Sequence, residues 1–192
     1  MYKHCNTEEG ALRQRQIENC LMDLMLTVPY SQITVGDICE KAGLSRKSFY
    51  RYFGSKEGCL HGLIDHCILD SHRAYHADPI SADDQAKVLE CYFIYWQQNN
   101  PLLEALCRND MANRLLERSM LCVTQEELEF RNFLNADNQD DAFEQALFIV
   151  SGITGLIIHW HMSGYQKSAA QMASITGRLL AKKLTPLFTE KS

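Results

Sequence analysis

The stretch from residue 33 to residue 56 constrains the fold most, because it places two short helical patterns on either side of a single glycine. Thr34 and Asp37 have the spacing of a helix-capping box, and Ser45 is a favourable N-cap for a second helix. Gly43 lies between the two patterns and suits the left-handed backbone that ends a helix. The stretch therefore predicts a helix-turn-helix whose two helices follow Thr34 and Ser45.

The second of these short helices is expected to be basic and aromatic on its outer surface. Five cations lie between residues 41 and 56, with no Asp or Glu among them. Phe49 and Phe53 are four residues apart and are expected to face inward, which turns their neighbours toward solvent. Exposed cations and hydroxyls suit the phosphates and base edges of double-stranded DNA. The candidate DNA-binding residues are Thr34, Ser45, Arg46, Lys47, Ser48, Tyr50, Arg51, Tyr52 and Lys56.

The division of charge along the chain indicates how such a helix would bind. The whole sequence has a formal net charge of −5, whereas residues 1–58 carry eight Lys/Arg against seven Asp/Glu. The remainder has 11 basic against 17 acidic residues and would repel DNA. Binding is therefore expected to be local and oriented, unlike that of a polycation that coats nucleic acid.

The pattern of apolar and helix-breaking residues in the rest of the chain predicts helices, and we predict an all-α fold of about nine helices. A first helix begins at Thr7 and ends before Pro29, and a fourth, starting at Ser55, runs to about residue 76. Further helices are expected at about 84–99, 101–108, 110–134, 140–164 and 168–188. We expect a helix-turn-helix domain at 1–54 and a helical effector-binding and dimerisation domain at 55–192, with the fourth helix as connector.

The N-terminal part resembles the tetracycline-repressor (TetR) family of transcriptional regulators over about 50 residues. The resemblance rests on Thr34, Asp37-Ile38, Ala42-Gly43-Leu44-Ser45, Phe49-Tyr50-Arg51-Tyr52-Phe53 and Ser55-Lys56-Glu57. It implies a homodimer that reads a palindromic operator in successive major grooves and, as we expect of a repressor, is released by a small molecule. It places residues 45–48 at the start of the recognition helix and Tyr50, Tyr52 and Lys56 on phosphates. Many relatives have a small residue at the position of Lys47. The long cationic side chain of Lys47 suits a contact with either a phosphate or a guanine.

The larger C-terminal part offers a candidate pocket and a candidate dimer surface. Aromatic residues gather at 92–96, and helices around them would enclose a cavity for a small apolar or aromatic effector; an ordinary helical core is the competing interpretation. The candidate pocket residues are Tyr92, Tyr95, Trp96, Leu103, Leu106, Cys107, Met111 and His159. Two later helices mix bulky with small residues, as helices that pack across a two-fold axis do. The candidate interface residues are Phe148, Ser151, Gly155, Ile158, Met172, Ile175 and Leu179.

Other function classes have little support in the sequence. None of the eight cysteines forms a C-x-x-C pair, and His72 and His76 have the i, i+4 spacing of metal ligands without an obvious third ligand, so no metal or cofactor is expected. The longest apolar run has 13 residues, too few for a membrane span, and the N-terminus lacks a secretory signal, which together favour the cytoplasm. Catalytic motifs of hydrolases, phosphate-binding loops and zinc proteases are absent, so no enzyme is expected. A helical adaptor that binds a protein instead of DNA remains the alternative.

Overall fold

The computed structural model describes residues 2, 7–76, 85–98, 101–124 and 141–181. Within these ranges the chain forms nine α-helices and one 3-10 turn, Tyr30–Gln32, and contains no β-strand beyond an isolated bridge between Tyr2 and Phe53. The helices are α1 (Glu8–Met25), α2 (Val35–Lys41), α3 (Arg46–Tyr52), α4 (Lys56–His76), α5 (Gln85–Gln98), α6 (Pro101–Arg108), α7 (Ala112–Thr124), α9 (Ala142–Met162) and α10 (Ala169–Ala181). The all-α prediction is confirmed. The predicted helix ends at 125–134 and 182–188 lie outside the described residues.

Side chains and one glycine set the ends of the N-terminal helices as the sequence predicts. Thr7 accepts the Gly10 N–H at 3.2 Å and begins α1. Thr34 and Asp37 form the reciprocal capping box of α2, and Gly43 follows that helix with a φ of +63°. Ser45 accepts the Ser48 N–H at 3.1 Å and begins α3. These local signals fix both the lengths and the relative directions of α2 and α3.

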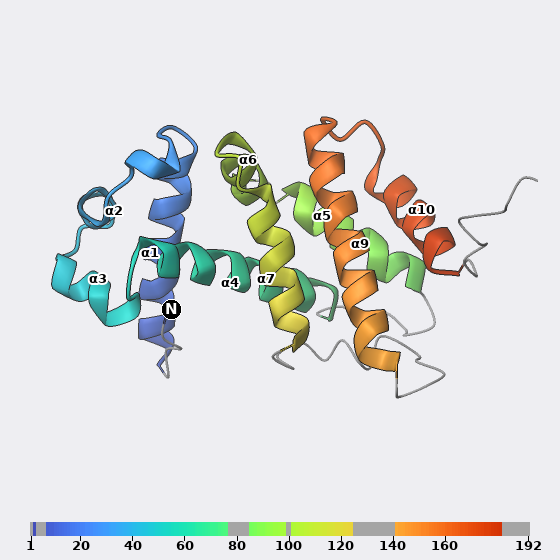
Figure 1. Ribbon diagram of the computed structural model, residues 1–192, viewed down its shortest axis with the longest axis horizontal. Coiled ribbons are helices and arrows are strands. Elements are labelled where there is room, and N and C mark those ends of the chain that lie inside the picture. The colour runs from blue at the N-terminus through green and yellow to red at the C-terminus, as the bar shows by residue number, and fades with distance from the viewer. Residues whose placement is uncertain (1, 3–6, 77–84, 99–100, 125–140, 182–192) are drawn as a thin grey trace, which may run out of the picture.

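Helix α4 runs through the molecule and connects its two ends (Figure 1). Helices α1, α2 and α3 surround its beginning, whereas α5, α7, α9 and α10 lie around and beyond its later turns. The apolar core is continuous between the two ends, from Ile17 and Leu21 in α1 through Leu60 and Ile64 in α4 to Trp160 in α9. Apolar packing therefore continues along α4 from the N-terminal helices to the C-terminal helices.

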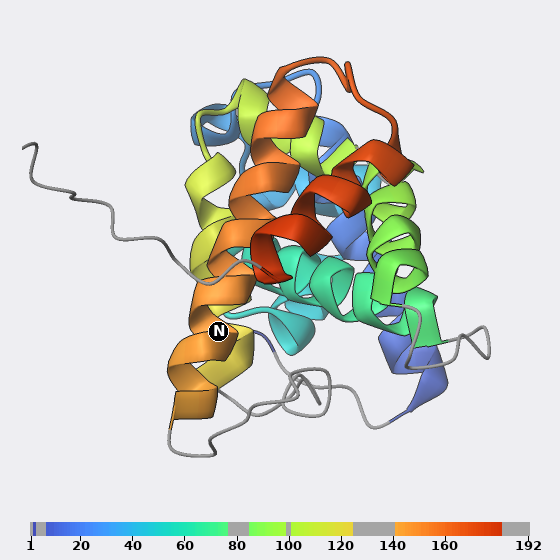
Figure 2. The same cartoon turned by 90° about the vertical axis from the view of Figure 1, so that its right-hand side faces the viewer.

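Helix α9 is the most apolar helix among the described residues. By length and composition, Phe143–Met162 could cross a membrane, which is weak evidence because core helices of soluble proteins pass the same criterion. In this structure α9 packs against α5, α6 and α7, and only 33% of that segment is buried within the chain. Figure 2 shows α9 and α10 crossing in front of the other helices, so both present a face that the other described helices leave uncovered.

The cysteines and histidines add no ligand cluster to this architecture. The seven cysteines that the structure describes are free thiols. No group of three or more His, Cys, Asp and Glu side chains is placed to hold a metal ion within the described ranges, and the side chain of His76 lies outside them. The structure therefore gives no observation in favour of a metal at His72.

Candidate nucleic-acid interface

The exposed surface of α3 carries the predicted cationic residues. Arg46, Lys47, Tyr50 and Arg51 are exposed, and Tyr50 retains 51% of its accessible surface. Phe49 and Phe53 are fully buried, as expected, with ring centroids 5.4 Å apart. The aromatic pair anchors α3 on the core and leaves three cations and a phenol in solvent. This arrangement presents positive charge without a neighbouring carboxylate on the same helix.

The hydroxyls of Thr34 and Ser45 act as helix caps. The Thr34 hydroxyl accepts the Asp37 N–H at 3.2 Å and donates to Asp37 Oδ2 at 2.8 Å, and the Thr34 N–H donates to the same oxygen at 2.7 Å. The hydrogen bonds from the Thr34 backbone and side chain lower the pKa of Asp37. Ser45 and Ser48 hydroxyls lie 3.1 Å apart at the start of α3. Contacts of these three hydroxyl residues with DNA remain predictions.

The Arg46 guanidinium lies against the first turn of α2. A Cβ atom added to Gly36 would lie 3.0 Å from Arg46 Nη2 and 3.2 Å from Thr34 Oγ1. Gly36 therefore leaves room for Arg46 to approach, and the guanidinium also lowers the pKa of Asp37 by its charge. Sequence reasoning missed this contact between α2 and α3. It gives Arg46 a defined position from which a planar fork can turn toward a base edge.

Tyr52 is buried, with 8% of its surface exposed, so the prediction that it is an exposed residue was wrong. Its hydroxyl accepts a hydrogen bond from Arg51 Nη2 at 3.2 Å, and the Arg51 guanidinium lies 5.1 Å from the Tyr52 ring centroid. Tyr52 is three residues from Phe49 and next to Phe53, so helical periodicity places it at the edge of the inner face. Its proposed phosphate contact stays a prediction that rests on the hydroxyl alone.

Lys56 is less available than the sequence suggests. Its Nζ donates to the carbonyl oxygens of Tyr30 and Ile33, both at 2.6 Å, and lies 4.2 Å from the Tyr30 ring centroid. Burial lowers the pKa of the Lys56 ammonium, since desolvation disfavours the charged form. Two of its three N–H groups hold the segment that leads into α2. Lys56 thus holds the segment before α2 in place, and only its third N–H could donate to a phosphate.

The predicted pocket residues fall into three groups. Trp96, Leu103 and Leu106 are fully buried, and Trp96 packs edge-on against Tyr95 with ring centroids 5.9 Å apart. Tyr92, Tyr95, Cys107 and Met111 are partly buried at the edge of this core. His159 is exposed on α9 and lies outside this core, so its place in a pocket stays a prediction.

The histidine two residues further along α9 lies in the interior instead. The side chain of His161 is 9% exposed, with Nε2 3.3 Å from Glu104 Oε2 and Nδ1 2.8 Å from the Tyr165 hydroxyl. Residues two apart on a helix point in different directions, so only one of His159 and His161 can face the core. Nothing in the sequence ranks the two, because the partner Glu104 comes from a distant helix.

The predicted dimer surface is largely uncovered by the residues that the structure describes. Phe148 is 66% exposed and Leu179 55% exposed, and nothing lies within 4 Å of a Cβ atom added to Gly155. Ser151, Ile158 and Ile175 are partly buried beside them. Met172 is 4% exposed and belongs to the core that α10 makes with α5, so its assignment to the interface was wrong.

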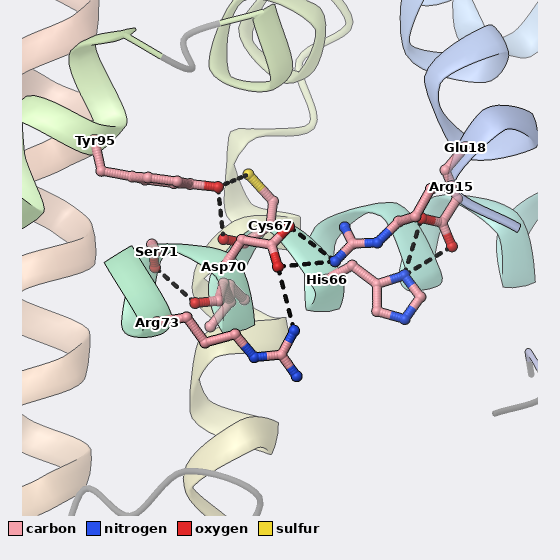
Figure 3. Close-up of polar contacts among 9 residues, drawn as sticks. Arg15, Glu18, His66, Cys67, Asp70, Ser71, Arg73 and Tyr95 are labelled. Carbon is pink, nitrogen blue, oxygen red and sulfur yellow. Dashed lines mark hydrogen bonds and ion pairs between the residues drawn. The ribbon is translucent and has the colours of Figure 1, made fainter. Parts of the chain in front are cut away.

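Two polar contacts tie α1 to α4 (Figure 3). Arg15 Nη2 lies 2.8 Å from Asp70 Oδ2, and His66 Nδ1 lies 2.9 Å from both carboxylate oxygens of Glu18. The Tyr95 hydroxyl of α5 donates to the Cys67 carbonyl at 3.3 Å, one residue from His66. Burial raises the pKa of the Cys67 thiol to about 11, which makes it a poor nucleophile. Sequence reasoning found none of these contacts.

We predict that Glu18→Gln gains stability relative to the parent protein as the pH rises from 4.5 to 7.5. Burial raises the pKa of Glu18 in the folded state, although the hydrogen bond from His66 opposes it. A raised folded-state pKa favours folding below the unfolded value of about 4.3, and this contribution disappears as pH rises through the folded-state pKa. Gln keeps an oxygen acceptor but never ionises. Urea unfolding of both proteins at several pH values measures the difference, and Glu9→Gln, at an exposed position, is the control. A difference that stays constant with pH would refute the prediction.

Comparison with known proteins assigns both parts of the chain. The family model for bacterial regulatory proteins of the tetR family matches residues 22–63, and a model for a transcriptional regulator C-terminal region matches residues 83–182. The first match contains the helix-turn-helix, and the second covers more than half of the 192 residues. Together they include most of the described fold.

Curated relatives and solved structures agree with this assignment. EthR of Mycolicibacterium smegmatis, an HTH-type transcriptional regulator, is 37% identical over 89 residues, which are 44% of this chain and 41% of EthR. DhaS of Lactococcus lactis, a transcriptional activator of the dhaKLM operon, is 33% identical over 60 residues, 31% of this chain and 32% of DhaS. These alignments span well under half of either relative.

The structure comparisons extend over nearly the whole chain. A TetR transcriptional regulator from Streptococcus agalactiae superposes with a TM-score of 0.61 at 18% identity, covering 91% of this chain and 96% of that one. The structure of DhaS gives a TM-score of 0.58 at 18% identity, covering 88% and 94%. At this identity the superpositions show the shared fold. With both family models matched, a helix-turn-helix in place and the fold shared, the chain belongs to the TetR family of transcriptional regulators.

Proposed function

We propose that the protein binds a palindromic DNA operator as a homodimer in the cytoplasm, represses transcription from it, and is released by a small apolar or aromatic effector. The observation that carries the proposal is the solvent-exposed cationic surface of α3. The rest of the chain is acidic and would repel DNA, so binding would depend on this surface. Residues 1–54 would bind DNA, residues 55–192 would sense and dimerise, and α4 would connect the two parts. Fluorescence anisotropy with the DNA upstream of the protein's own gene tests the proposal. We expect specific binding whose affinity falls as salt rises, and no preference over scrambled DNA would contradict it.

The uncovered face of α9 and α10 supports the homodimer. Phe148, Gly152, Gly155 and Met162 recur at intervals of three, four or seven residues along α9, and each is exposed. Glycines at two of these positions let a second helix approach closely, and Phe148 and Met162 supply apolar area at the ends. A two-fold axis through this face would place two α9 helices and two α10 helices together. The apolar character of α9 then serves subunit association.

Phe148→Asp should convert the dimer largely to a monomer. Each dimer buries two copies of Phe148, and a buried aromatic anchor contributes about 2 kcal/mol or more to association. A carboxylate in that position would also be desolvated. Light scattering after gel filtration measures the mass. Leu12→Asp is the matched control, because Leu12 is 65% exposed on α1, far from α9 in the fold. A Phe148→Asp protein that keeps the dimer mass at micromolar concentration would exclude this face as the interface.

The effector would act through the partly buried aromatic edge of the C-terminal core. Tyr92 and Tyr95 sit there, and burial raises the pKa of both phenols, so both stay neutral. Neutral aromatic walls suit an apolar or aromatic ligand better than an anion. An effector that binds one separation of the two heads more tightly would shift the population and lower operator affinity.

Activation of transcription is the second candidate outcome, and the similarity to DhaS, which is named an operon activator, is what favours it. Both outcomes use the same DNA-binding surface and differ in where the operator lies relative to the promoter. A reporter fused to the upstream DNA distinguishes them. Deletion of the gene should raise reporter expression if the protein represses and lower it if the protein activates.

A further inference from the structure

The turn between α6 and α7 holds the N-terminal part of the chain through one amide side chain. Asn109 Nδ2 donates to the carbonyl of Met25, at the end of α1, at 3.0 Å and to that of Ala105 at 2.7 Å. Asn109 Oδ1 accepts the Tyr30 backbone N–H at 2.6 Å. Both ends of the amide are therefore engaged, one with α6 and α1 and the other with the 3-10 turn. The adjoining residue, Asp110, has a φ of +56°, so the turn has a defined and uncommon backbone.

Tyr30 is in turn fixed to the start of α4 by three other contacts. Its carbonyl accepts from Lys56 Nζ at 2.6 Å, its ring lies under the same ammonium, and its hydroxyl donates to Glu57 Oε2 at 3.1 Å. Lys56 also holds Ile33, the residue before the N-cap of α2. Position and direction of α2 therefore depend on the placement of Tyr30, four residues before Thr34.

The body of α6 is attached to α9 on its other side. Glu104 Oε2 lies 3.3 Å from His161 Nε2, and Leu102, Leu103 and Leu106 are buried within the C-terminal core. Helix α6 contacts α1, α7 and α9. Helix α6 and the turn at Asn109 that follows it thus connect α9 to the 3-10 turn that precedes α2 (Figure 1). A short helix that is packed into the core along its length and hydrogen-bonded at its C-terminal end transmits a displacement instead of absorbing it.

We propose that Asn109 is a positioning residue that couples α9, through α6, to α2 of the helix-turn-helix. A movement of α6 carries Asn109 with it and shifts Tyr30, which changes where α2 begins relative to α3. The inference rests on the proposed function for its consequence, since DNA binding is what a displaced α2 would alter. The coupling itself is a property of the free protein and needs no DNA.

Amide hydrogen exchange of the full-length protein, followed by mass spectrometry without DNA, tests this coupling. Asn109→Ala should speed exchange of residues 30–41 roughly tenfold, the effect of losing the one hydrogen bond that Asn109 makes to this segment, while the middle of α4 stays protected. Asn113→Ala, at an exposed position in α7, is the matched control and should change nothing there. Asn109→Asp keeps the oxygen that accepts from Tyr30, so the Tyr30 amide should remain slower than in Asn109→Ala. Equal acceleration in all helices, or none in residues 30–41, would overturn the inference.

A double-variant cycle separates coupling from a purely local effect. His161→Ala removes the polar contact between α9 and Glu104 of α6 and should speed exchange of residues 30–41 when Asn109 is present. In the Asn109→Ala background the same substitution should add less than a twofold change, because the connection is already lost. Additive effects, or no effect of His161→Ala in the parent protein, would refute the connection through Asn109. If the cycle behaves as expected but no DNA is bound, the coupling stands and the proposed function fails.

Discussion

Arg46→Ala should weaken operator binding by about 1–3 kcal/mol for each half-site, a loss of roughly five- to 150-fold per head, and should relax sequence preference at one base pair. The guanidinium is exposed at the first turn of α3 and is held near Thr34 and Gly36, so it is ready to form a bidentate pair with guanine. Both subunits of a dimer carry the substitution, so the loss would occur twice on a palindrome. Anisotropy titrations against a panel of operators with single base changes measure affinity and preference together.

Two matched variants define what the Arg46 result means. Arg46→Lys keeps the positive charge but loses the planar fork, so we expect it to lose the base preference and retain most of the salt dependence. Lys41→Ala removes one cation at the end of α2 that is paired with Asp23 at 3.5 Å, and it should change affinity little. Equal losses for Arg46→Ala and Lys41→Ala would show that only overall charge matters, against a base contact by Arg46.

Asp65→Ala should be the most destabilising substitution of those considered, lowering the free energy of unfolding by about 3–5 kcal/mol. Asp65 of α4 and Arg118 of α7 form a two-pronged pair, with Arg118 Nε 2.6 Å from Asp65 Oδ1 and Nη2 bonded to the other oxygen. The two side chains are only 4% and 13% exposed. The hydrogen bonds to Asp65 raise the pKa of the Arg118 guanidinium in the parent protein. A guanidinium does not deprotonate in proteins, so without Asp65 its charge would remain buried and unpaired. Urea unfolding, and a melting temperature lower by roughly 6–20 °C, would report the loss.

Replacing both Asp65 and Arg118 separates the cost of the unpaired buried charge from other effects of the substitution. Asp65→Leu combined with Arg118→Met should recover most of the lost stability, because no ion is left without a partner. Arg114 forms the more exposed pairs of the same helix, with Glu57 and Glu117, and Arg114→Ala should cost no more than about 1 kcal/mol. A double variant as unstable as Asp65→Ala would show that packing, and not the orphaned charge, sets the effect.

The sequence predicts most of the helix-turn-helix because its determinants are local. Thr34, Asp37, Gly43 and Ser45 act within one turn of their own helices, and the structure has each in its predicted role. The spacing of Phe49 and Phe53 likewise fixes which side of α3 is exposed. Features of this kind need no knowledge of what packs from elsewhere.

Apart from the burial of Tyr52, which its neighbours Phe49 and Phe53 explain, the errors and omissions arise where the partner is distant in sequence. Tyr30 and Asn109 are 79 residues apart, and no periodicity relates them. In the sequence Lys56 resembles a free surface cation, but in the structure it donates hydrogen bonds to the carbonyls of Tyr30 and Ile33. Met172 belongs to an apolar stripe of α10, part of which packs against α5 while the rest faces solvent. The sequence alone does not show which residues of the stripe are in the core. The operator and the effector depend on such long-range geometry as well.

A footprint of the protein on the DNA upstream of its own gene tests the central claim most directly. Two recognition helices related by a two-fold axis should protect two half-sites related by a palindrome, with centres about 10 base pairs, or a multiple of that, apart on one face of the duplex. Arg46→Ala at the same concentration should leave both half-sites unprotected. Protection of two such half-sites by the parent protein is the result that the account predicts. No protection even at low salt, or a protected region without two-fold symmetry, would contradict it.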